Sequence, residues 1–349
     1  MKKTFKHAII LTTLLILTSL FLFNCEDSNP IKIEEIPGRR DYVWRIDTLR
    51  KYDPFYRLWG SSPKNIFVTG AGPFDKKVIH YNGENWSYNT SLGIVSIYSI
   101  GGFSENETFL GGSKGRILKL NGTDWEVIEN FESDGSNEIG INQIWGFNEN
   151  NFYAAGACRD ATEYYNKTVV FNYKNSRWNQ LNMNGARGIV ESICKESTSS
   201  PLYFNTIYWG GGVSTDSTFL YEYSDSKTSR IYSGEDDYDE GSTISMIGNK
   251  IFFSIGEKLF IRKNKKFVEV LNLENENYYN KFWGKNGKDI FLKMTDGLAH
   301  YNGTDVEYLF SFDKPKTHVF DALLFEDEVF FLVYEDATTM SFIYHGKLL

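Results

Sequence analysis

Short runs of apolar and aromatic residues, separated by turn residues, follow one another along most of the chain. Residues 58–86 show this pattern most clearly. A Trp-Gly pair and a tight turn precede the run Asn65–Gly70, and a loop, the run Val78–Tyr81, an Asn-Gly turn and Trp86 follow it. Runs rich in β-branched and aromatic residues between such turns are typical of β-strands. The segment therefore predicts a unit of four short antiparallel strands.

The same unit recurs along the chain, which indicates a repeat protein. Seven units can be distinguished, and they begin near Phe55, Ile97, Ile141, Val190, Ile244, Phe282 and Val319. The fourth and fifth units carry little of the motif, so six or eight units remain alternatives. The seventh unit has only three strands, whereas the segment Tyr42–Leu49 has the alternation of a fourth strand without a unit of its own.

Pairing of Tyr42–Leu49 with the seventh unit would close the array into a ring and leave no exposed edge at the seam. Residues 42–349 divided among seven units give about 44 residues a unit, within the roughly 40–50 residues of a propeller blade. The sequence thus predicts an all-β fold, a seven-bladed β-propeller of four-stranded antiparallel blades spanning 42–349. Tryptophans recur at two positions of the unit, which predicts packing between blades; they are Trp59, Trp145 and Trp283, and Trp44, Trp86, Trp125 and Trp178.

Residues 1–24 have the composition of an export signal. Lys2, Lys3 and Lys6 precede an uncharged apolar run, Ala8–Phe23, which is shorter than the roughly 20 residues of a membrane-spanning helix. Cys25 follows directly. We expect cleavage before Cys25 and a lipid on its thiol; an ordinary secretory signal and an uncleaved anchor are the alternatives.

Residues 25–41 are polar and acidic and contain two prolines, so they predict a flexible tether between lipid and propeller. The repeat Trp-Gly-x4-Asn-Ile-Phe, followed by His-Tyr-Asn-Gly-x2-Trp, resembles that of exported bacterial propeller lipoproteins over nearly all of the chain after the signal. The resemblance implies a lipid-anchored protein of the bacterial cell envelope, on the periplasmic or the cell-surface side of the outer membrane. It indicates the fold and is nearly silent on function.

The formal net charge of the chain is −8, and removal of residues 1–24 with their three lysines lowers it to −11. This charge argues against nucleic acid as a partner and against electrostatic docking on anionic lipid. Two cysteines remain beyond the signal, Cys158 and Cys194. Export would permit a disulfide between them, and two unrelated buried thiols are the alternative. We expect a monomer without a cofactor.

Three features of the sequence suggest chemistry only weakly. Residues 111–115 fit the Gly-x-Ser-x-Gly pattern of a serine nucleophile, but they lie between two predicted strands, where glycines serve a turn. His80 and His300 occupy equivalent positions in separate units, so they cannot converge on one metal ion. The acidic stretch 235–240 offers Asp237 and Asp239 as calcium ligands, although a solvated turn explains it as well.

The insertions between the repeated strands are more informative. The longest are residues 129–140, 157–168, 209–217 and 234–241, and together they define what we call the long-loop face. In a propeller these loops share one face, and neighbouring units should bring them together. They supply aromatic, basic and acidic side chains suited to a polar ligand, so we predict a ligand-binding site formed by Arg159, Asp160, Tyr164, Tyr165, Trp209 and Asp216. Ordinary drift of loops between repeats is the alternative.

These observations favour a non-enzymatic binding or scaffolding module that recognises a protein or a glycan. The rival hypothesis is a carbohydrate-active enzyme, a glycoside hydrolase or lyase. Such an enzyme needs two carboxylates about 5–10 Å apart at the mouth of the channel. The predicted innermost strands are poor in acids, with Glu191 and Asp321 as the exceptions.

Overall fold

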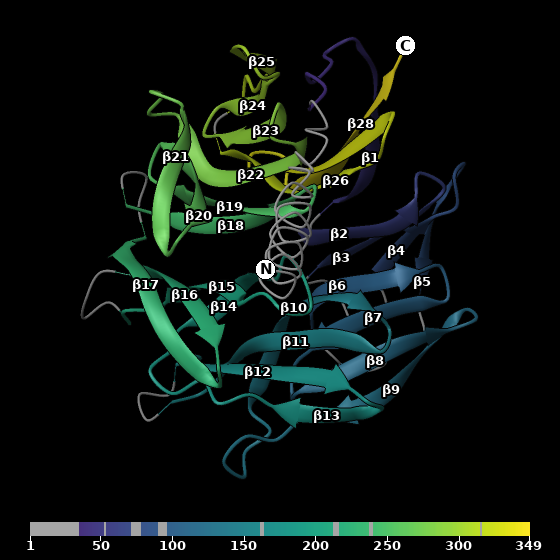
Figure 1. Ribbon diagram of the computed structural model, residues 1–349. Coiled ribbons are helices and arrows are strands. Elements are labelled where there is room, and N and C mark those ends of the chain that lie inside the picture. Colours follow the sequence, from purple (N-terminus) through teal and green to yellow (C-terminus); the bar gives the residue numbers. More distant parts are fainter. Residues whose placement is uncertain are drawn as a thin grey trace, which may run out of the picture. The chain divides into compact units, whose positions relative to one another are not determined.

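The structure is a computed structural model that describes residues 35–51, 54–70, 78–89, 96–160, 164–211, 216–236, 240–314 and 316–349. Every regular element assigned in these ranges is a β-strand, and the strands form seven antiparallel four-stranded sheets. Within each sheet the strands follow chain order, with one exception at the seam of the ring. This arrangement confirms the predicted seven-bladed β-propeller (Figure 1).

The first three blades consist of β2 (Phe55–Ser62), β3 (Asn65–Gly70), β4 (Val78–Tyr81) and β5 (Trp86–Asn89); β6 (Ile97–Ser104), β7 (Glu107–Gly112), β8 (Arg116–Asn121) and β9 (Asp124–Asn130); and β10 (Ile139–Asn148), β11 (Asn151–Cys158), β12 (Lys167–Lys174) and β13 (Arg177–Gln180). The fourth and fifth blades consist of β14 (Ile189–Cys194), β15 (Leu202–Tyr208), β16 (Ser217–Ser224) and β17 (Lys227–Glu235); and β18 (Ser242–Ile247), β19 (Lys250–Ile255), β20 (Lys258–Lys263) and β21 (Lys266–Asn272). The last two blades consist of β22 (Tyr278–Asn286), β23 (Asp289–Met294), β24 (Gly297–Tyr301) and β25 (Val306–Ser311); and β26 (Thr317–Leu324), β27 (Glu328–Glu335), β28 (Met340–Leu348) and β1 (Tyr42–Lys51).

The ring closes where β1 pairs with β28. Tyr42 lies opposite Leu348 and Thr48 opposite Phe342 in an antiparallel register. Figure 1 shows β1, in purple, beside β28, in yellow, although they come from opposite ends of the sequence. The lone strand predicted at residues 42–49 therefore completes the seventh blade, and both strands gain hydrogen-bonding partners at what would otherwise be two open edges.

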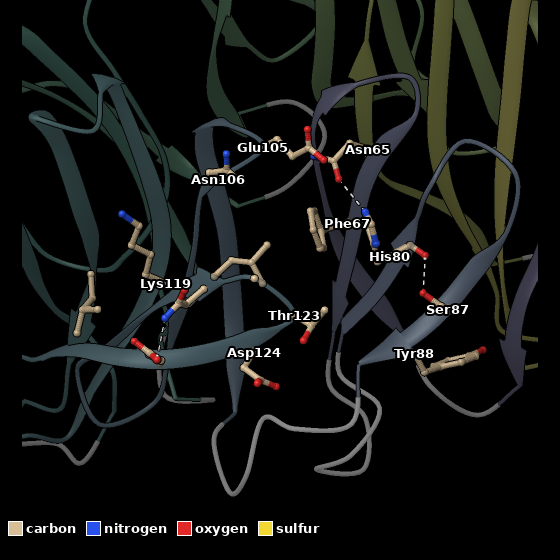
Figure 2. A pocket seen from close by; sticks show the side chains of 15 residues that line it. Asn65, Phe67, His80, Ser87, Tyr88, Glu105, Asn106, Lys119, Thr123 and Asp124 are labelled. Carbon is tan, nitrogen blue, oxygen red and sulfur yellow. Dashed lines mark hydrogen bonds between the residues drawn. The ribbon is translucent and has the colours of Figure 1, made fainter.

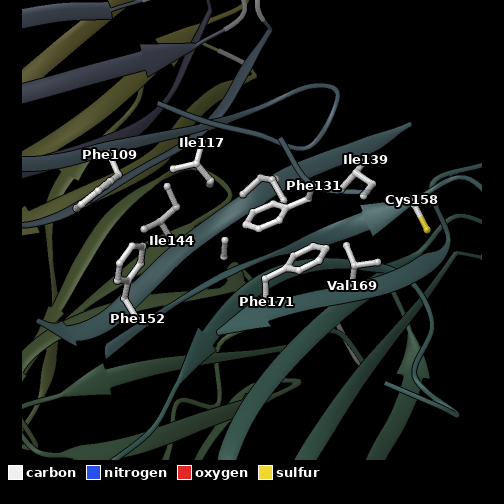
Figure 3. Close-up of a cluster of buried hydrophobic side chains, with 11 residues drawn as sticks. Phe109, Ile117, Phe131, Ile139, Ile144, Phe152, Cys158, Val169 and Phe171 are labelled. Carbon is white, nitrogen blue, oxygen red and sulfur yellow. The ribbon is translucent and has the colours of Figure 1, made fainter. Parts of the chain in front are cut away.

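The core consists of apolar layers between neighbouring blades. Buried residues in the described ranges form seven clusters, and each cluster joins two adjacent sheets of the ring. Between the second and third blades the rings of Phe131 and Phe171 stack with centroids 3.9 Å apart (Figure 3). Trp178 meets Phe131 edge-on. Recurrent aromatic residues on facing sheets thus fill each interface, because burial of their large apolar surface stabilises the ring.

The tryptophans of both repeated positions pack as predicted. Trp44 of β1 lies edge-on to Phe310 at 4.6 Å, and Trp283 of β22 contacts Phe331 of the next blade. The pattern Gly111–Gly115 likewise spans the end of β7 and the turn to β8, and Gly115 adopts a positive φ of 65°. Its interpretation as a turn is confirmed.

The structure decides between the alternatives left open for the two cysteines and places the end of the predicted tether. Cys158 and Cys194 are both buried and free, because Cys158 packs between the second and third blades and Cys194 between the fourth and fifth, so no disulfide joins them. The end of the predicted tether 25–41 is not free either. The propeller unit begins at Ile36, and Gly38 donates its amide proton to the carbonyl of Lys288 at 2.8 Å.

The predicted signal 1–24 and the lipidation site Cys25 lie outside the described residues. Within the described ranges no helix is long and apolar enough to cross a membrane.

Candidate ligand-binding face

The four insertions of the long-loop face touch one another in a row, as predicted. They connect β9 to β10, β11 to β12, β15 to β16 and β17 to β18, so strand direction places them at the same edge of consecutive blades. The contacts that join them are an ion pair of Lys167 with Asp134, hydrogen bonds of Tyr165 with Glu138 at 3.4 Å and of Asn166 with Trp209 at 2.9 Å, and one from the Asp236 amide to the Asp216 carbonyl at 2.9 Å.

At one end of this row Arg159 lies over an aromatic ring. Its guanidinium carbon is 5.3 Å from the ring centroid of Tyr165, and its Nε is 3.9 Å from the carboxylate of Glu138. The hydroxyl of Tyr165 donates to the same carboxylate. Since Glu138 balances its charge, Arg159 offers a ligand a guanidinium already oriented by its neighbours, with about half of the side chain exposed.

Trp209 lies at the centre of the face, where hydrogen bonds fix its backbone and its ring is exposed. The side chain of Asn166 donates to the carbonyl of Trp209 at 2.9 Å and accepts from its amide at 3.0 Å. Asn166 is itself only 2% exposed, whereas Trp209 is 52% exposed. A large ring presented on a fixed backbone can bind a partner with little loss of conformational entropy.

Tyr164 belongs to the same assembly. Its carbonyl accepts a hydrogen bond from the amide of Asn166 at 2.9 Å, and its ring is 41% exposed. Gly211 lies against that ring with a φ of 66°, and a Cβ atom there would approach the Tyr164 Cε2 atom to 2.8 Å. Asn166 therefore connects the two exposed aromatic residues, Tyr164 and Trp209, although they come from neighbouring blades.

Two residues predicted as ligand contacts are engaged with the loops themselves. Asp216 accepts a hydrogen bond from the amide of Gly210 at 2.8 Å through its carboxylate, and its carbonyl accepts one from Asp236. The amide of Asp160 donates to the carbonyl of Tyr164 at 2.9 Å. Asp216 thus fixes the backbone beside Trp209.

The centre of the ring holds a second group of charged residues. A cavity of about 200 Å³ is lined from the innermost strands, and both Glu191 and Asp321 line it. Arg57 of β2 lies 3.3 Å from the carboxylate of Glu191. Asp321 accepts a hydrogen bond from the amide of Leu58 at 2.9 Å and another from Trp283 Nε1 at 3.3 Å. Both carboxylates are therefore held by cross-blade contacts.

Two lysines lie near this centre, Lys281 half-buried and Lys293 buried. Lys281 donates to the carbonyl of Phe320 at 2.5 Å; burial lowers its pKa, and Asp321 opposes that shift. Lys293 is only 8% exposed, with its amine 4.2 Å from the ring centroid of Tyr279. Burial, assisted by repulsion from Lys281, lowers the pKa of Lys293 to about 7. Charge in this region is thus costly, because desolvation disfavours an ammonium group.

Comparison with solved structures agrees with the fold. YCF48 bound to a D1 peptide is similar with a TM-score of 0.63 and 13% sequence identity, over 90% of this chain and 98% of that one. The extracellular domain of a hybrid two-component system of B. thetaiotaomicron has a TM-score of 0.58 and 11% identity over 86% of this chain, which spans 39% of that protein's chain. The WD40 propeller domain of Doa1 has a TM-score of 0.58 and 9% identity, over 86% and 96% of the two chains.

These similarities establish the propeller architecture and nothing finer. A scan of protein-family models and a search of curated proteins find no match to the chain.

The remaining candidates offer less. Asp237 and Asp239 lie outside the described residues. In the part of the chain that the structure describes, no three histidine, cysteine or acidic side chains are grouped as a metal site requires. His80 and His300 do occupy equivalent strands of the first and sixth blades.

Sequence reasoning missed Glu138, Asn166 and Lys293. Alignment of the repeats could have shown Lys293, because it interrupts an apolar run at the position that Thr69 holds in the first unit. Glu138 and Asn166 lie in insertions between the repeated strands, where alignment of the repeats gives no such signal.

Proposed function

We propose that the chain is a lipid-anchored binding module of the bacterial cell envelope, and that its long-loop face recognises an extended protein segment. The observation that carries this proposal is the pair of exposed aromatic residues, Tyr164 and Trp209, fixed on one scaffold by the buried Asn166. Exposed aromatic rings on a rigid support are typical of the residues that dominate the energy of protein interfaces.

The chemistry of the face suits a peptide. Two aromatic rings offer apolar contact, and the oriented Arg159 offers a hydrogen-bond donor for a carbonyl or carboxylate. YCF48, a structural neighbour, is itself bound to a peptide in its solved structure. A glycan could also stack on Trp209, and it remains the alternative ligand.

The arrangement at the channel supports binding over catalysis. A hydrolase of the rival type needs one carboxylate free to donate a proton and a second free to attack or to activate water. Here Glu191 is paired with Arg57, and Asp321 accepts three hydrogen bonds. Hydrolysis of a polysaccharide that Glu191→Gln abolishes would favour the enzyme instead.

The anchor is proposed on the sequence of residues 1–25. A lipid on Cys25 would hold the protein at the outer membrane, where a net charge of −11 gives little attraction to anionic lipid. Metabolic labelling with a radioactive fatty acid tests this. The wild-type chain should carry the label and Cys25→Ser should not. An unlabelled wild-type chain would remove the anchor from the proposal.

Selection from a random-peptide display library tests the binding site. Peptides selected on the wild-type protein should lose at least about tenfold in affinity for Trp209→Ala. Val268→Ala, at an exposed apolar residue of β21, serves as the matched control and should bind as the wild type does. Equal affinity for the wild type and Trp209→Ala would contradict the site, and recognition of a glycan array alone would replace the peptide by a sugar.

A further inference from the structure

The first and sixth blades share a small polar motif at the edge opposite the long-loop face. In the sixth blade His300 bonds to the Asp289 carboxylate at 2.8 Å and lies against Phe291, with ring centroids 4.5 Å apart and ring planes tilted by 37°. In the first blade His80 bonds to Asn65 at 2.7 Å and stacks against Phe67 at 4.4 Å. The third strand of each blade supplies the histidine, and the second strand supplies its two partners.

The turns beside the motif also match. Gly303, in the turn after β24, lies against the side-chain stem of Lys288, and Gly83, in the turn after β4, lies against that of Lys64. Aligned residues therefore build a similar local surface in both blades, with Asn65 of the first blade in the place of Asp289.

In the sixth blade this surface is covered by the chain's own segment 36–41. The amide of Gly38 donates to the carbonyl of Lys288 at 2.8 Å, and Asn286 donates to the carbonyl of Ile36 at 3.1 Å. Gly38 passes so close to the motif that a Cβ atom there would lie 2.6 Å from His300 Cε1. His300 is 0% exposed as a result.

A basic side chain completes the contact. Arg40 donates to the carbonyls of His300 and Asp305, each at 2.8 Å. Its guanidinium also pairs with the carboxylates of Asp305 at 2.8 Å and Glu307 at 3.2 Å. The covering segment is thus recognised by its extended backbone, by a glycine above the histidine and by an arginine two residues later.

The same surface of the first blade is open. A cavity of about 880 Å³ lies between the first and second blades, and Asn65, Phe67 and His80 form part of its wall (Figure 2). In keeping with this, His80 is only half-buried. The cavity is large enough for several residues of an extended peptide.

A difference between two outer strands helps to explain the opening. Beside the sixth blade, the residue two positions before Trp44 is Tyr42 of β1, whose ring centroid is 6.3 Å from that of Phe291. Beside the first blade, the residue two before Trp125 is Thr123, which lines the cavity. A small side chain thus stands where the sixth blade's neighbour presents a ring.

The charge of the cavity indicates what it accepts. Glu105, Asp124 and Glu126 line it, while its lysine, Lys119, is paired with Glu107 at 2.8 Å. The three carboxylates come from the second blade and could replace Asp305 and Glu307 as partners of a basic side chain. An acidic wall beside a histidine surface favours a cationic segment.

We propose that the cavity between the first and second blades is a second binding site, which accepts an extended basic segment of a partner protein in the way that the sixth blade accepts residues 36–41. The segment places a glycine above His80 and hydrogen-bonds to the carbonyl of Lys64. An arginine or lysine two residues later reaches the carboxylates of the second blade. This site is separate from the long-loop face, since the loops β6–β7 and β8–β9 border it.

The chain supplies its own probe. A capped peptide with the sequence of residues 36–40, Ile-Pro-Gly-Arg-Arg, should bind the full protein and shift the imidazole NMR signal of His80, assigned with His80→Gln, but not that of His300. Replacement of the peptide's glycine by valine, or of its last arginine by glutamine, should weaken binding at least about fivefold. Added salt should weaken it as well.

Variants of the protein locate the site. Thr123→Tyr, which supplies the missing ring, should abolish binding, and Glu105→Gln should weaken it with the cavity kept open. Val268→Tyr adds the same ring at an exposed site away from the cavity and should bind normally. No binding at millimolar peptide, or a shift of His300 in place of His80, would overturn the proposal. Dimerisation of the protein alone that Thr123→Tyr abolishes would also overturn it, because the occupant would then be a second copy.

Discussion

Gly38 lies directly over His300, and the gap between them admits no side-chain atom. A Cβ atom at position 38 would stand 2.6 Å from His300 Cε1 and 2.9 Å from Asp289 Oδ1. The imidazole has no free direction in which to move, because it is fully buried and hydrogen-bonded to that carboxylate. The segment before β1 is therefore part of the folded ring.

Gly38→Val should destabilise the protein by about 1–3 kcal/mol, because the added side chain either displaces the segment or strains its contacts. Ile36→Ala alters a residue of the same segment that is 76% exposed, and should change stability by less than about 0.5 kcal/mol. Urea unfolding of the two variants checks this. Equal stability of Gly38→Val and the wild type would mean that the segment contributes nothing.

Asn166→Ala should reduce the free energy of unfolding by about 1–3 kcal/mol, since the backbone groups of Trp209 lose their buried partner. Trp209→Ala removes a half-exposed ring and should leave stability within about 0.5 kcal/mol. Both variants should weaken binding at the long-loop face. The prediction fails if Trp209→Ala proves the more destabilising of the two in thermal unfolding.

Lys293→Met should stabilise the fold most at low pH. The pKa of Lys293 is about 7 in the fold against 10.5 for an exposed lysine, so below pH 7 the amine is charged in both states and the cost of burying that charge is fully present. Between pH 7 and 10.5 the unfolded wild type binds a proton that the folded state lacks, so wild-type stability rises by up to about 1.4 kcal/mol per pH unit.

The advantage of Lys293→Met over the wild type should therefore shrink between pH 7 and pH 10. Urea unfolding at several pH values measures it. An advantage that stays constant with pH would show that the amine titrates normally.

Deletion of residues 1–51 should yield a chain that associates, because it removes β1 and exposes the edge of β28. Deletion of residues 1–35 retains the whole propeller unit and is the matched control. Size-exclusion chromatography should find the control discrete and the shorter chain aggregated. A discrete shorter chain with unchanged stability would show that closure contributes little.

Cys158 and Cys194 should both react with a thiol reagent in guanidinium chloride without prior reduction, and neither should react quickly in the native protein. Burial raises the pKa of both thiols, which disfavours the reactive thiolate. A chain beginning at residue 26 keeps Cys25 out of the assay. Absence of reactive thiols until a reductant is added would indicate a disulfide.

The fold could be predicted from the sequence because its information is local and repeated. Each unit contains the residues that specify its own strands and turns. The lone strand predicted at residues 42–49 could complete only the seventh unit, which had three strands. Even the weakly marked fourth unit, predicted to begin near Val190, forms a complete blade of four strands, β14 to β17.

The site was harder to predict, because it depends on contacts between units. Repeat alignment made His80 and His300 equivalent, but it could not show that segment 36–41 covers one histidine and leaves the other open. Nor could it show that Asn166 ties Trp209 in place, since the two lie in different blades. Prolines and charges in residues 25–41 suggested a tether, whereas Gly38 and Arg40 bind the sixth blade.

Pairing of Tyr42 with Leu348 also has a consequence for how the protein acquires its structure. Six blades are assembled from consecutive strands and can condense locally, but the seventh must bring together the two most distant segments of the sequence. Such a contact carries the largest loop-closure entropy in the chain and forms late. While the polypeptide is still being synthesised, β1 has no strand to pair with. Closure of the ring is therefore the expected slow step of folding, and the interval in which a chaperone would be most useful.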